Sequence, residues 1–383
     1  MKQYDFARPI FGEPERSAVN HVMSGLWLAS GQENAAFEKE FAAYIGVPYA
    51  LCVNSGSSAN LLALAALNLP KGSKVLTSAC GFPATLSPIL HLGLEPVLVD
   101  YDINTYNIDV SQVVEKIPDV KAILFAHTMG SPVQMGQIIV ECVKHGVLII
   151  EDCCEALGAI YYKGQVGGLG AMGTFSFYPS HQITALGGGG MITFNDEAHY
   201  RRAKSMRDWG KQSNWDAYGQ NDTAYDTVVD GLDYFKHYAY ETMGYNFKLP
   251  EANAAFGRVQ MGRLDEFVES RSHNHDMLAQ LLGAVTPLNV RHDVAINGKP
   301  SWFGVVMRTP ERNQFGQYLE DNGIKHRPFF AGNITRHPPF SQFKKSYPVA
   351  DKLMTDALFV GCHPGLNTDD IHDMATIIAG YWK

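Results

Sequence analysis

The sequence predicts an α/β fold, with a mostly parallel sheet flanked by helices and a smaller α+β domain after it. Between residues 49 and 152, short apolar runs alternate with helix-like stretches, which is typical of βαβ units. A chain of 383 residues is also long enough for one large and one smaller domain. The expected strands are Tyr49–Val53, Val75–Thr77, Pro96–Val99, Ala122–Phe125 and Val147–Ile150. Because ligands bind at the carboxyl ends of parallel strands, we expect the functional site just after these runs.

A second pattern, which begins near Leu249, predicts a small domain at 249–383 after a large domain at 1–248. Its expected elements are helices at Leu249–Arg271, Glu311–Asn322 and Asp369–Trp382, and a strand at Trp302–Met307. The segment from Lys211 to Tyr240 is rich in Asp, Tyr, Gly and Asn and has no clear periodicity. We interpret this segment as a long ordered insertion in the large domain.

Composition and charge exclude several classes of function. A hydrophobic content of 46% with 18% charged residues is ordinary for a folded soluble protein. The net charge of -8, without any Lys/Arg-rich run, argues against binding of nucleic acid or an anionic membrane. Met1–Glu13 lacks the pattern of a signal peptide, and no run approaches the roughly 20 apolar residues that span a bilayer. We therefore expect a cytoplasmic protein.

The cysteines predict neither disulfides nor a metal site. There is no C-x-x-C motif in this chain, and scattered cysteines without an export signal are typically buried small hydrophobes. Cys153 and Cys154 are adjacent near a strand end, where successive side chains face opposite ways, so we do not expect them to chelate one metal together. The six cysteines are Cys52, Cys80, Cys142, Cys153, Cys154 and Cys362.

Three segments carry the candidate chemistry. Asn54–Asn60 is a Ser/Gly-rich turn that opens the predicted helix Ala59–Leu67; it is either a phosphate site at a helix N-terminus or a simple helix cap. Glu151-Asp152 ends a predicted strand, where Asp152 either holds a pyridinium proton or caps the next turn. Gly173–His181 runs into four successive glycines, Gly187–Gly190, which suggests a close approach of the backbone to another group.

In this order and spacing, the three segments resemble the DegT/DnrJ/EryC1/StrS family of PLP-dependent sugar aminotransferases, a branch of the fold type I aminotransferase superfamily. The resemblance runs from about Gly12 to the C-terminus. It implies a fold type I aminotransferase-like structure with PLP or PMP as the cofactor. Supporting stretches are Gly31–Asn34, Asp100–Asp102, Arg207–Gly210 and Gly244–Leu249.

The resemblance also implies roles for single residues. Gly56, Ser57 and Ser176 would bind the cofactor phosphate, and Phe82 would stack on the pyridine ring. Asp152 would pair with the ring nitrogen.

Two further positions complete the implied cofactor site. Asn246 resembles the residue that reaches the phosphate across a dimer interface, which implies a homodimer. Glu155 stands where the family usually has glutamine, and its implied contact is with the ring hydroxyl.

His181 is the main departure from the family, because it occupies the position of the lysine that forms the Schiff base. An imidazole cannot form that bond, but its ordinary pKa near 6.5 suits a general base. The replacement resembles a subset of the family, the 3-dehydratases of nucleotide-linked 4-keto-6-deoxysugars. The stretches Arg327–Arg336 and Leu358–His363 resemble the same enzymes, and the candidate substrate contacts are Arg327, Asn333 and Arg336.

The subset contains an iron–sulfur type, which acts on CDP sugars, and a colitose type, which acts on GDP sugars. The stretch Asp208–Ala224 resembles the insertion that carries the cluster, yet it contains no cysteine, and a cluster usually needs four thiolates. We therefore expect no metal and no iron–sulfur cluster, and a cycle in which L-glutamate converts PLP back to PMP. Two alternatives remain: an aminotransferase that uses Lys163 or Lys211, and a non-catalytic PLP-binding homologue.

Overall fold

The computed structural model describes residues 2–25, 27–212, 227–235, 238–285 and 288–383. Its main sheet has seven strands in the order β1-β9-β8-β5-β4-β2-β3. β9 is antiparallel to both β1 and β8, and the other pairs are parallel, so the predicted mostly parallel sheet is confirmed. The strands are β1 (Tyr49–Val53), β2 (Lys74–Ser78), β3 (Glu95–Val99), β4 (Ala122–Ala126), β5 (Leu148–Asp152), β8 (Met172–Ser176) and β9 (Gly190–Phe194).

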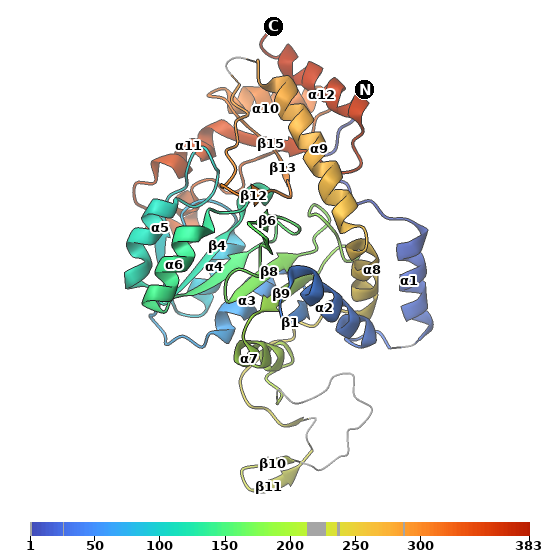
Figure 1. The fold of residues 1–383 in the computed structure, drawn as a ribbon, viewed down its shortest axis with the longest axis vertical. Helices are drawn as coiled ribbons and strands as arrows, with labels where there is room; N and C mark the ends of the chain where they lie inside the picture. Colours follow the sequence, from blue (N-terminus) through green and yellow to red (C-terminus); the bar gives the residue numbers. More distant parts are fainter. Residues whose placement is uncertain (1, 26, 213–226, 236–237, 286–287) are drawn as a thin grey trace.

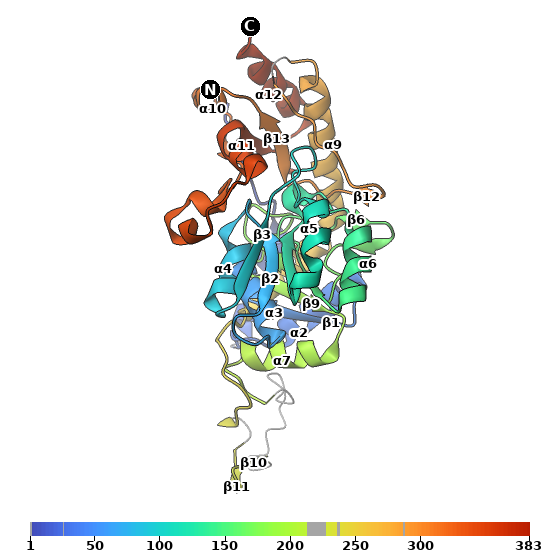
Figure 2. The same cartoon turned by 90° about the vertical axis from the view of Figure 1, so that its left-hand side faces the viewer.

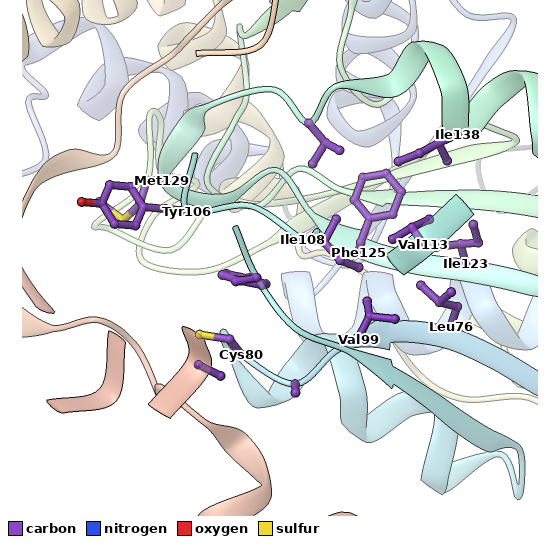
Figure 3. Packing of buried hydrophobic residues seen from close by; sticks show 14 of the residues in the cluster. Leu76, Cys80, Val99, Tyr106, Ile108, Val113, Ile123, Phe125, Met129 and Ile138 are labelled. Carbon is purple, nitrogen blue, oxygen red and sulfur yellow. The ribbon is translucent and has the colours of Figure 1, made fainter. Parts of the chain in front are cut away.

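Helices cover both faces of this sheet (Figures 1 and 2). Successive residues of a strand point to opposite faces. Ile123 and Phe125 of β4 therefore pack in one core cluster with Val113 and Ile138, as Figure 3 shows, whereas Leu124 packs in a second cluster. The helices of this part before β10 are α1 (Glu13–Ser24), α2 (Gln32–Ile45), α3 (Gly56–Ala66), α4 (Pro83–His91), α5 (Val110–Lys116), α6 (Met135–His145) and α7 (Glu197–Arg207).

The predicted helix from Leu249 to Arg271 is two helices, α8 (Glu251–Met261) and α9 (Leu264–Leu282). Gly262 ends α8 as its C-cap, since glycine is a poor helix former. The break separates their contacts: α8 packs against α1 and α2, whereas α9 packs against α12. α9 thus connects the two parts of the molecule (Figure 1).

The C-terminal part is built on a three-stranded antiparallel sheet in the order β13-β15-β14. Its strands are β13 (Gly304–Arg308), β14 (His326–Pro328) and β15 (Ala357–Gly361). Its helices after α9 are α10 (Arg312–Asp321), α11 (Pro348–Asp356) and α12 (Thr368–Gly380). A small sheet in the order β12-β6-β7 lies between the two parts, formed by β6 (Ile160–Tyr161), β7 (Gly164–Gln165) and β12 (Gly298–Lys299). Short 3-10 helices span Ile117–Asp119, Thr128–Gly130, Ile334–Arg336 and Pro338–Phe343.

The predicted insertion at 211–240 lies partly outside the described residues. Its described part contains a hairpin of β10 (Thr227–Val229) and β11 (Leu232–Tyr234), at the end of the molecule opposite α12 (Figures 1 and 2). Among the described helices, none has the length and apolar content that crossing a membrane requires.

Candidate active site

A cavity of about 590 Å³ opens at the carboxyl ends of the parallel strands, where the sequence predicted the functional site. β5 contributes Asp152 directly, β8 contributes Ser176, and the loop after β2 contributes Phe82. Segments that are far apart in the sequence therefore meet around one space. The predicted residues that line this cavity are Gly56, Ser57, Phe82, Asp152, Glu155, Ser176, His181 and Arg327.

One wall of the cavity is the N-terminus of α3. Ser55 is the N-cap, and its Oγ accepts a hydrogen bond from the backbone N–H of Ser58 at 3.1 Å. A Cβ atom on Gly56 would lie 2.6 Å from Cβ of Ser176, so only glycine allows α3 and β8 to approach so closely. Free backbone N–H groups, the positive end of the helix and two serines thus face one place, which suits a phosphate.

The carboxylate of Asp152 is held by three donors. Its Oδ2 accepts hydrogen bonds from Asn60 Nδ2 and Thr85 Oγ1, both at 2.8 Å, and its Oδ1 accepts one from the Cys154 N–H at 3.1 Å. Asn60 is itself fixed, because Thr174 Oγ1 donates to its Oδ1 at 2.5 Å. These contacts fix the orientation of the carboxylate beside the cavity.

Sequence reasoning did not identify these supporting residues. Asn60 ends the Asn54–Asn60 segment, one turn into α3, and its place in that candidate segment was the available signal. Thr85 and Thr174 had no such signal, because threonine is common in both helices and strands.

Glu155 lines the same cavity, and its Oε2 accepts a hydrogen bond from the N–H of Met129 at 2.8 Å. Burial, with a smaller contribution from the charge of Asp152, raises the pKa of Glu155 to about 8. At neutral pH this carboxyl group is therefore largely protonated, and it can donate as well as accept a hydrogen bond. A protonated glutamate thus resembles the glutamine that the family usually has here, because both side chains can donate and accept a hydrogen bond.

His181 lies in the turn after β8, and its N–H donates to the carbonyl of Tyr178 at 2.9 Å. Its imidazole packs against the ring of Phe303, with 5.4 Å between the ring centroids. Within the described part of the chain, the buried Nδ1 atom has no hydrogen-bond partner. Burial, and then the charge of Arg271, lower the pKa of His181 to about 3, so its imidazole is neutral at pH 7. A neutral imidazole is the form that accepts a proton.

The cavity wall contains no lysine among the residues that the structure describes. Lys163 is exposed in the β6–β7 turn, and Lys211 is buried beside Tyr240; neither residue lines the cavity. Both alternative positions for a covalent cofactor link therefore lie away from Asp152 and His181.

The three candidate substrate residues lie in different places. Arg327 lines the cavity, and its guanidinium lies over the ring of Phe6 at 5.2 Å. Asn333 is buried and Arg336 is on the surface, and both bind Asp351 at 2.5–2.6 Å. Neither Asn333 nor Arg336 lines the cavity.

Asn246 also lies outside the cavity wall of its own chain. It is exposed and pairs with the backbone of Asp208. Phe82, at the cavity, is 59% exposed.

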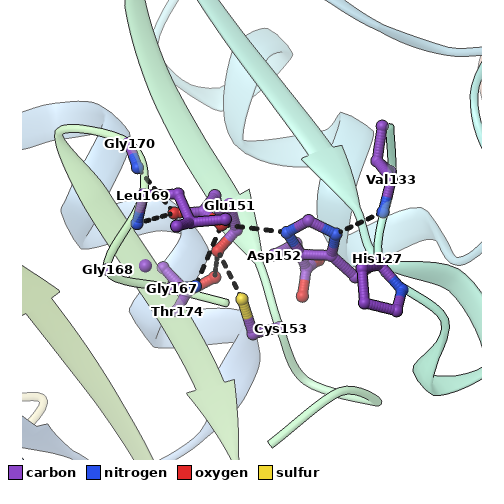
Figure 4. Close-up of polar contacts among 12 residues, drawn as sticks. His127, Val133, Glu151, Asp152, Cys153, Gly167, Gly168, Leu169, Gly170 and Thr174 are labelled. Atoms are coloured by element: carbon purple, nitrogen blue, oxygen red, sulfur yellow. Dashed lines mark hydrogen bonds and ion pairs between the residues drawn. The ribbon is translucent and has the colours of Figure 1, made fainter. Parts of the chain in front are cut away.

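His127, Glu151 and Cys153 have potential metal ligands close together, but hydrogen bonds within the protein occupy them (Figure 4). His127 Nδ1 accepts a hydrogen bond from the Val133 N–H at 2.9 Å, so Nε2 carries the proton and donates to Glu151 Oε2 at 3.0 Å. Glu151 accepts three more hydrogen bonds, from the N–H groups of Gly167, Leu169 and Gly170. We therefore assign this group a structural role, which is to hold the 167–170 loop at the end of β5.

The sequence matches the DegT/DnrJ/EryC1/StrS aminotransferase family over residues 9–379. It is 38% identical to the lipopolysaccharide biosynthesis protein RfbH of Salmonella typhimurium, over 94% of this chain and 88% of that protein. It is 35% identical to the dTDP-4-dehydro-2,6-dideoxy-D-glucose 3-dehydratase of Saccharopolyspora spinosa, over 95% and 83% of the two chains.

Among solved structures, a crystal structure of GDP-4-keto-6-deoxymannose-3-dehydratase with a trapped PLP-glutamate geminal diamine matches with a TM-score of 0.88 and 27% identity. The match covers 98% of this chain and 100% of that one. The predicted fold type I aminotransferase-like architecture is thereby confirmed. The chain belongs to the DegT/DnrJ/EryC1/StrS aminotransferase family of PLP-dependent enzymes.

Proposed function

We propose that this protein is a PLP/PMP-dependent 3-dehydratase, which removes the C3 hydroxyl group of a nucleotide-linked 4-keto-6-deoxysugar. One observation carries the proposal: His181 and Asp152 line the same cavity, and no described residue of its wall is a lysine. A histidine can move a proton but cannot form the covalent link that transamination in this family uses.

The side chains of the cavity fit the cofactor. The helix N-terminus at Gly56 and Ser57, together with Ser176, would hold its phosphate, and the fixed carboxylate of Asp152 would hold the proton of its ring nitrogen. Glu155 would bind the ring hydroxyl, and Phe82 would cover the ring face. When bound, the cofactor supplies an amine for the sugar ketone and an electron-poor ring that stabilises negative charge.

His181 would act as the general base at this site. Its ring lines the cavity, and its Nδ1 has no hydrogen-bond partner among the described residues, so it can accept a proton from a carbon atom that lies in the cavity. Asp152 would support the same step, since it keeps the ring nitrogen protonated while negative charge develops. The C3 hydroxyl group would then leave.

Glutamate would be the co-substrate that restores the amine form of the cofactor. Oxidation of glutamate to 2-oxoglutarate provides two electrons, which are the two electrons needed to replace C3–OH by C3–H. Glutamate plus the keto sugar then gives 2-oxoglutarate, ammonia and the 3-deoxy product, with water formed in one step and consumed in another. The solved relative with its PLP-glutamate adduct supports this choice.

The active unit would be a homodimer, in which Asn246 of each copy completes the phosphate site of the other. Its exposed position outside its own cavity supports this arrangement. The absence of cysteine from 208–224 supports a cycle without an iron–sulfur cluster. The likeness to a lipopolysaccharide biosynthesis protein supports a deoxysugar made for a surface polysaccharide.

The second candidate function is sugar transamination, the activity for which the family is named. A single assay separates the two functions: the protein is incubated with PLP, glutamate and CDP-, GDP-, dTDP- or UDP-4-keto-6-deoxysugars. A dehydratase releases ammonia and gives a keto sugar that has lost one oxygen atom. An aminotransferase gives an amino sugar and releases no ammonia. Formation of 2-oxoglutarate alone would show that the protein is no inert homologue, but an amino sugar would overturn the proposal.

A further inference from the structure

Arg271, on α9, is a buried cation directly behind the candidate active site. It is 3% exposed, and within the described residues no carboxylate lies within salt-bridge distance of it. Burial lowers the pKa of its guanidinium. Burying a charge without a partner of opposite charge is costly, so its contacts must compensate.

Arg271 contacts the thiol of Cys362, and its other partners are backbone carbonyls of the active-site loops. Its Nη2 donates to the carbonyl of His181 at 2.9 Å, and its Nη1 lies 3.4 Å from the carbonyls of Trp302 and Phe303. Phe303 is the residue whose ring packs against the imidazole of His181. One guanidinium therefore joins the turn that carries the imidazole to the segment that supports it.

Segment 301–303 is fixed from two other sides. The N–H groups of Ser301 and Phe303 donate to the carbonyls of Gly130 and Met129 at 2.9 and 3.0 Å. The ring of His275, one turn after Arg271 on α9, stacks on Trp302 with 3.7 Å between the centroids. The segment is thus a rigid support for the imidazole.

Gln182 forms a second connection, because its Nε2 donates to the carbonyls of Ser301, at 2.9 Å, and Glu155. Segment 301–303 is therefore connected both to His181 and to the loop that carries Glu155.

We propose that Arg271 is a positioning residue for His181: it holds the backbone of the turn and the support of the imidazole in one arrangement. This inference rests on the proposed role of His181 as general base. Arg271 does not line the cavity, so it touches neither substrate nor cofactor.

Charged and titratable residues lie on two sides of His181, one facing the cavity and one facing away from it. The cavity side has Tyr101, Asp152, Cys154, Glu155, Tyr178 and Arg327, and the other side has Arg8 and Arg271. Of these side chains, only that of Arg271 forms a hydrogen bond with the backbone of His181.

The test compares Arg271→Met with Arg271→Lys, and uses Arg258→Met as the matched control. Arg258, on α8, binds Glu33 and Glu40 of α2, and it does not line the cavity. Because a displacement of about 1 Å can cost about 10²-fold in rate, the Met variant should lose about 10²-fold in kcat with KM changed less than about threefold. The Lys variant, which keeps a buried donor and its charge, should recover at least tenfold of that loss, and the control should equal the wild type.

Hydrogen–deuterium exchange of the cofactor-free protein gives a readout that needs no turnover. In the Met variant, amide exchange should increase in peptides covering 178–186 and 300–304 and stay unchanged in α3. Equal losses in kcat and PLP affinity, no recovery with lysine, or exchange that increases throughout the molecule would overturn the positioning role. If wild-type protein shows no dehydration at all, the proposed function fails, whereas the exchange result still tests the contacts of Arg271.

Discussion

Glu155 and Asp152 line the same cavity, where burial, together with the charge of Asp152, raises the pKa of the Glu155 carboxyl group to about 8. Because this pKa lies above the ordinary value of 4.5, the stabilising contribution of the neutral carboxyl group is complete below about pH 4.5. It is then lost as the pH rises through about 8.

The first prediction follows from this loss of stability with rising pH. Glu155→Gln removes the titration, so its free energy of unfolding relative to wild type should increase with pH between about 4.5 and 8. The slope should approach about 1.4 kcal/mol per pH unit, the value for one proton. Urea unfolding of both proteins at a series of pH values measures this difference. Near pH 4.5 the two proteins should be almost equally stable, and parallel curves across the range would contradict the shifted pKa.

The buried pair of His127 and Glu151 supports a prediction about stability. Glu151→Gln replaces one accepting oxygen by an NH₂ group, so at least one of the backbone N–H groups it binds would be left unpaired. An unsatisfied buried group costs about 1–3 kcal/mol, and thermal unfolding should show a loss of that size. Glu141→Gln, on α6, affects only surface contacts, with Lys144 and His145, and should change stability by less than about 0.5 kcal/mol. Equal losses in the two variants would remove the structural role of Glu151.

The sequence predicted the architecture well because local patterns decide it. The five apolar runs became β1 to β5 with ends shifted by a few residues at most, since a strand buried on both faces needs a continuous apolar run. The division between α8 and α9 was missed, because Gly262 interrupts an otherwise continuous helical periodicity and only tertiary packing shows the change of partner.

The candidate site was predictable where a residue sits in a recognisable segment, as Asp152 and His181 do. The supporting contacts were not predictable, because they depend on distances between segments. Arg271 is one arginine in a helical pattern, and nothing local shows that its guanidinium reaches the carbonyl of His181 across 90 residues of chain. Asn333 shows the opposite case. It lies in a recognisable motif, but the motif did not reveal that its side chain donates a hydrogen bond to Asp351.

The third prediction concerns the role of His181. His181→Asn should still bind PLP, because the groups around Gly56 and Asp152 are unchanged, but its dehydration rate should drop by about 10²–10⁴-fold. Absorbance spectra and equilibrium dialysis measure binding, and product mass measures the rate. A variant with unchanged turnover would remove His181 from the chemistry.

The fourth prediction concerns His181→Lys, which should gain the ability to bind PLP covalently. Borohydride reduction and intact mass should show PLP bound covalently to this variant, and no covalent PLP in the wild type. A lysine-linked cofactor in the wild-type protein would contradict the assignment of the site.

The last prediction concerns the source of electrons. Residues 208–224 contain no cysteine, and the group of potential metal ligands found among the described residues has a single cysteine, so we expect no four-thiolate cluster. In the proposed cycle, oxidation of glutamate would provide both electrons that the loss of the C3 hydroxyl group needs. Purified protein should therefore contain no stoichiometric iron by metal analysis, and dehydration with glutamate alone should release one ammonia per sugar. Addition of NADH and a reductase should leave the rate unchanged. If product forms only when they are present, an external electron supply is required and the glutamate cycle falls, whereas the role of His181 stays testable through its variants.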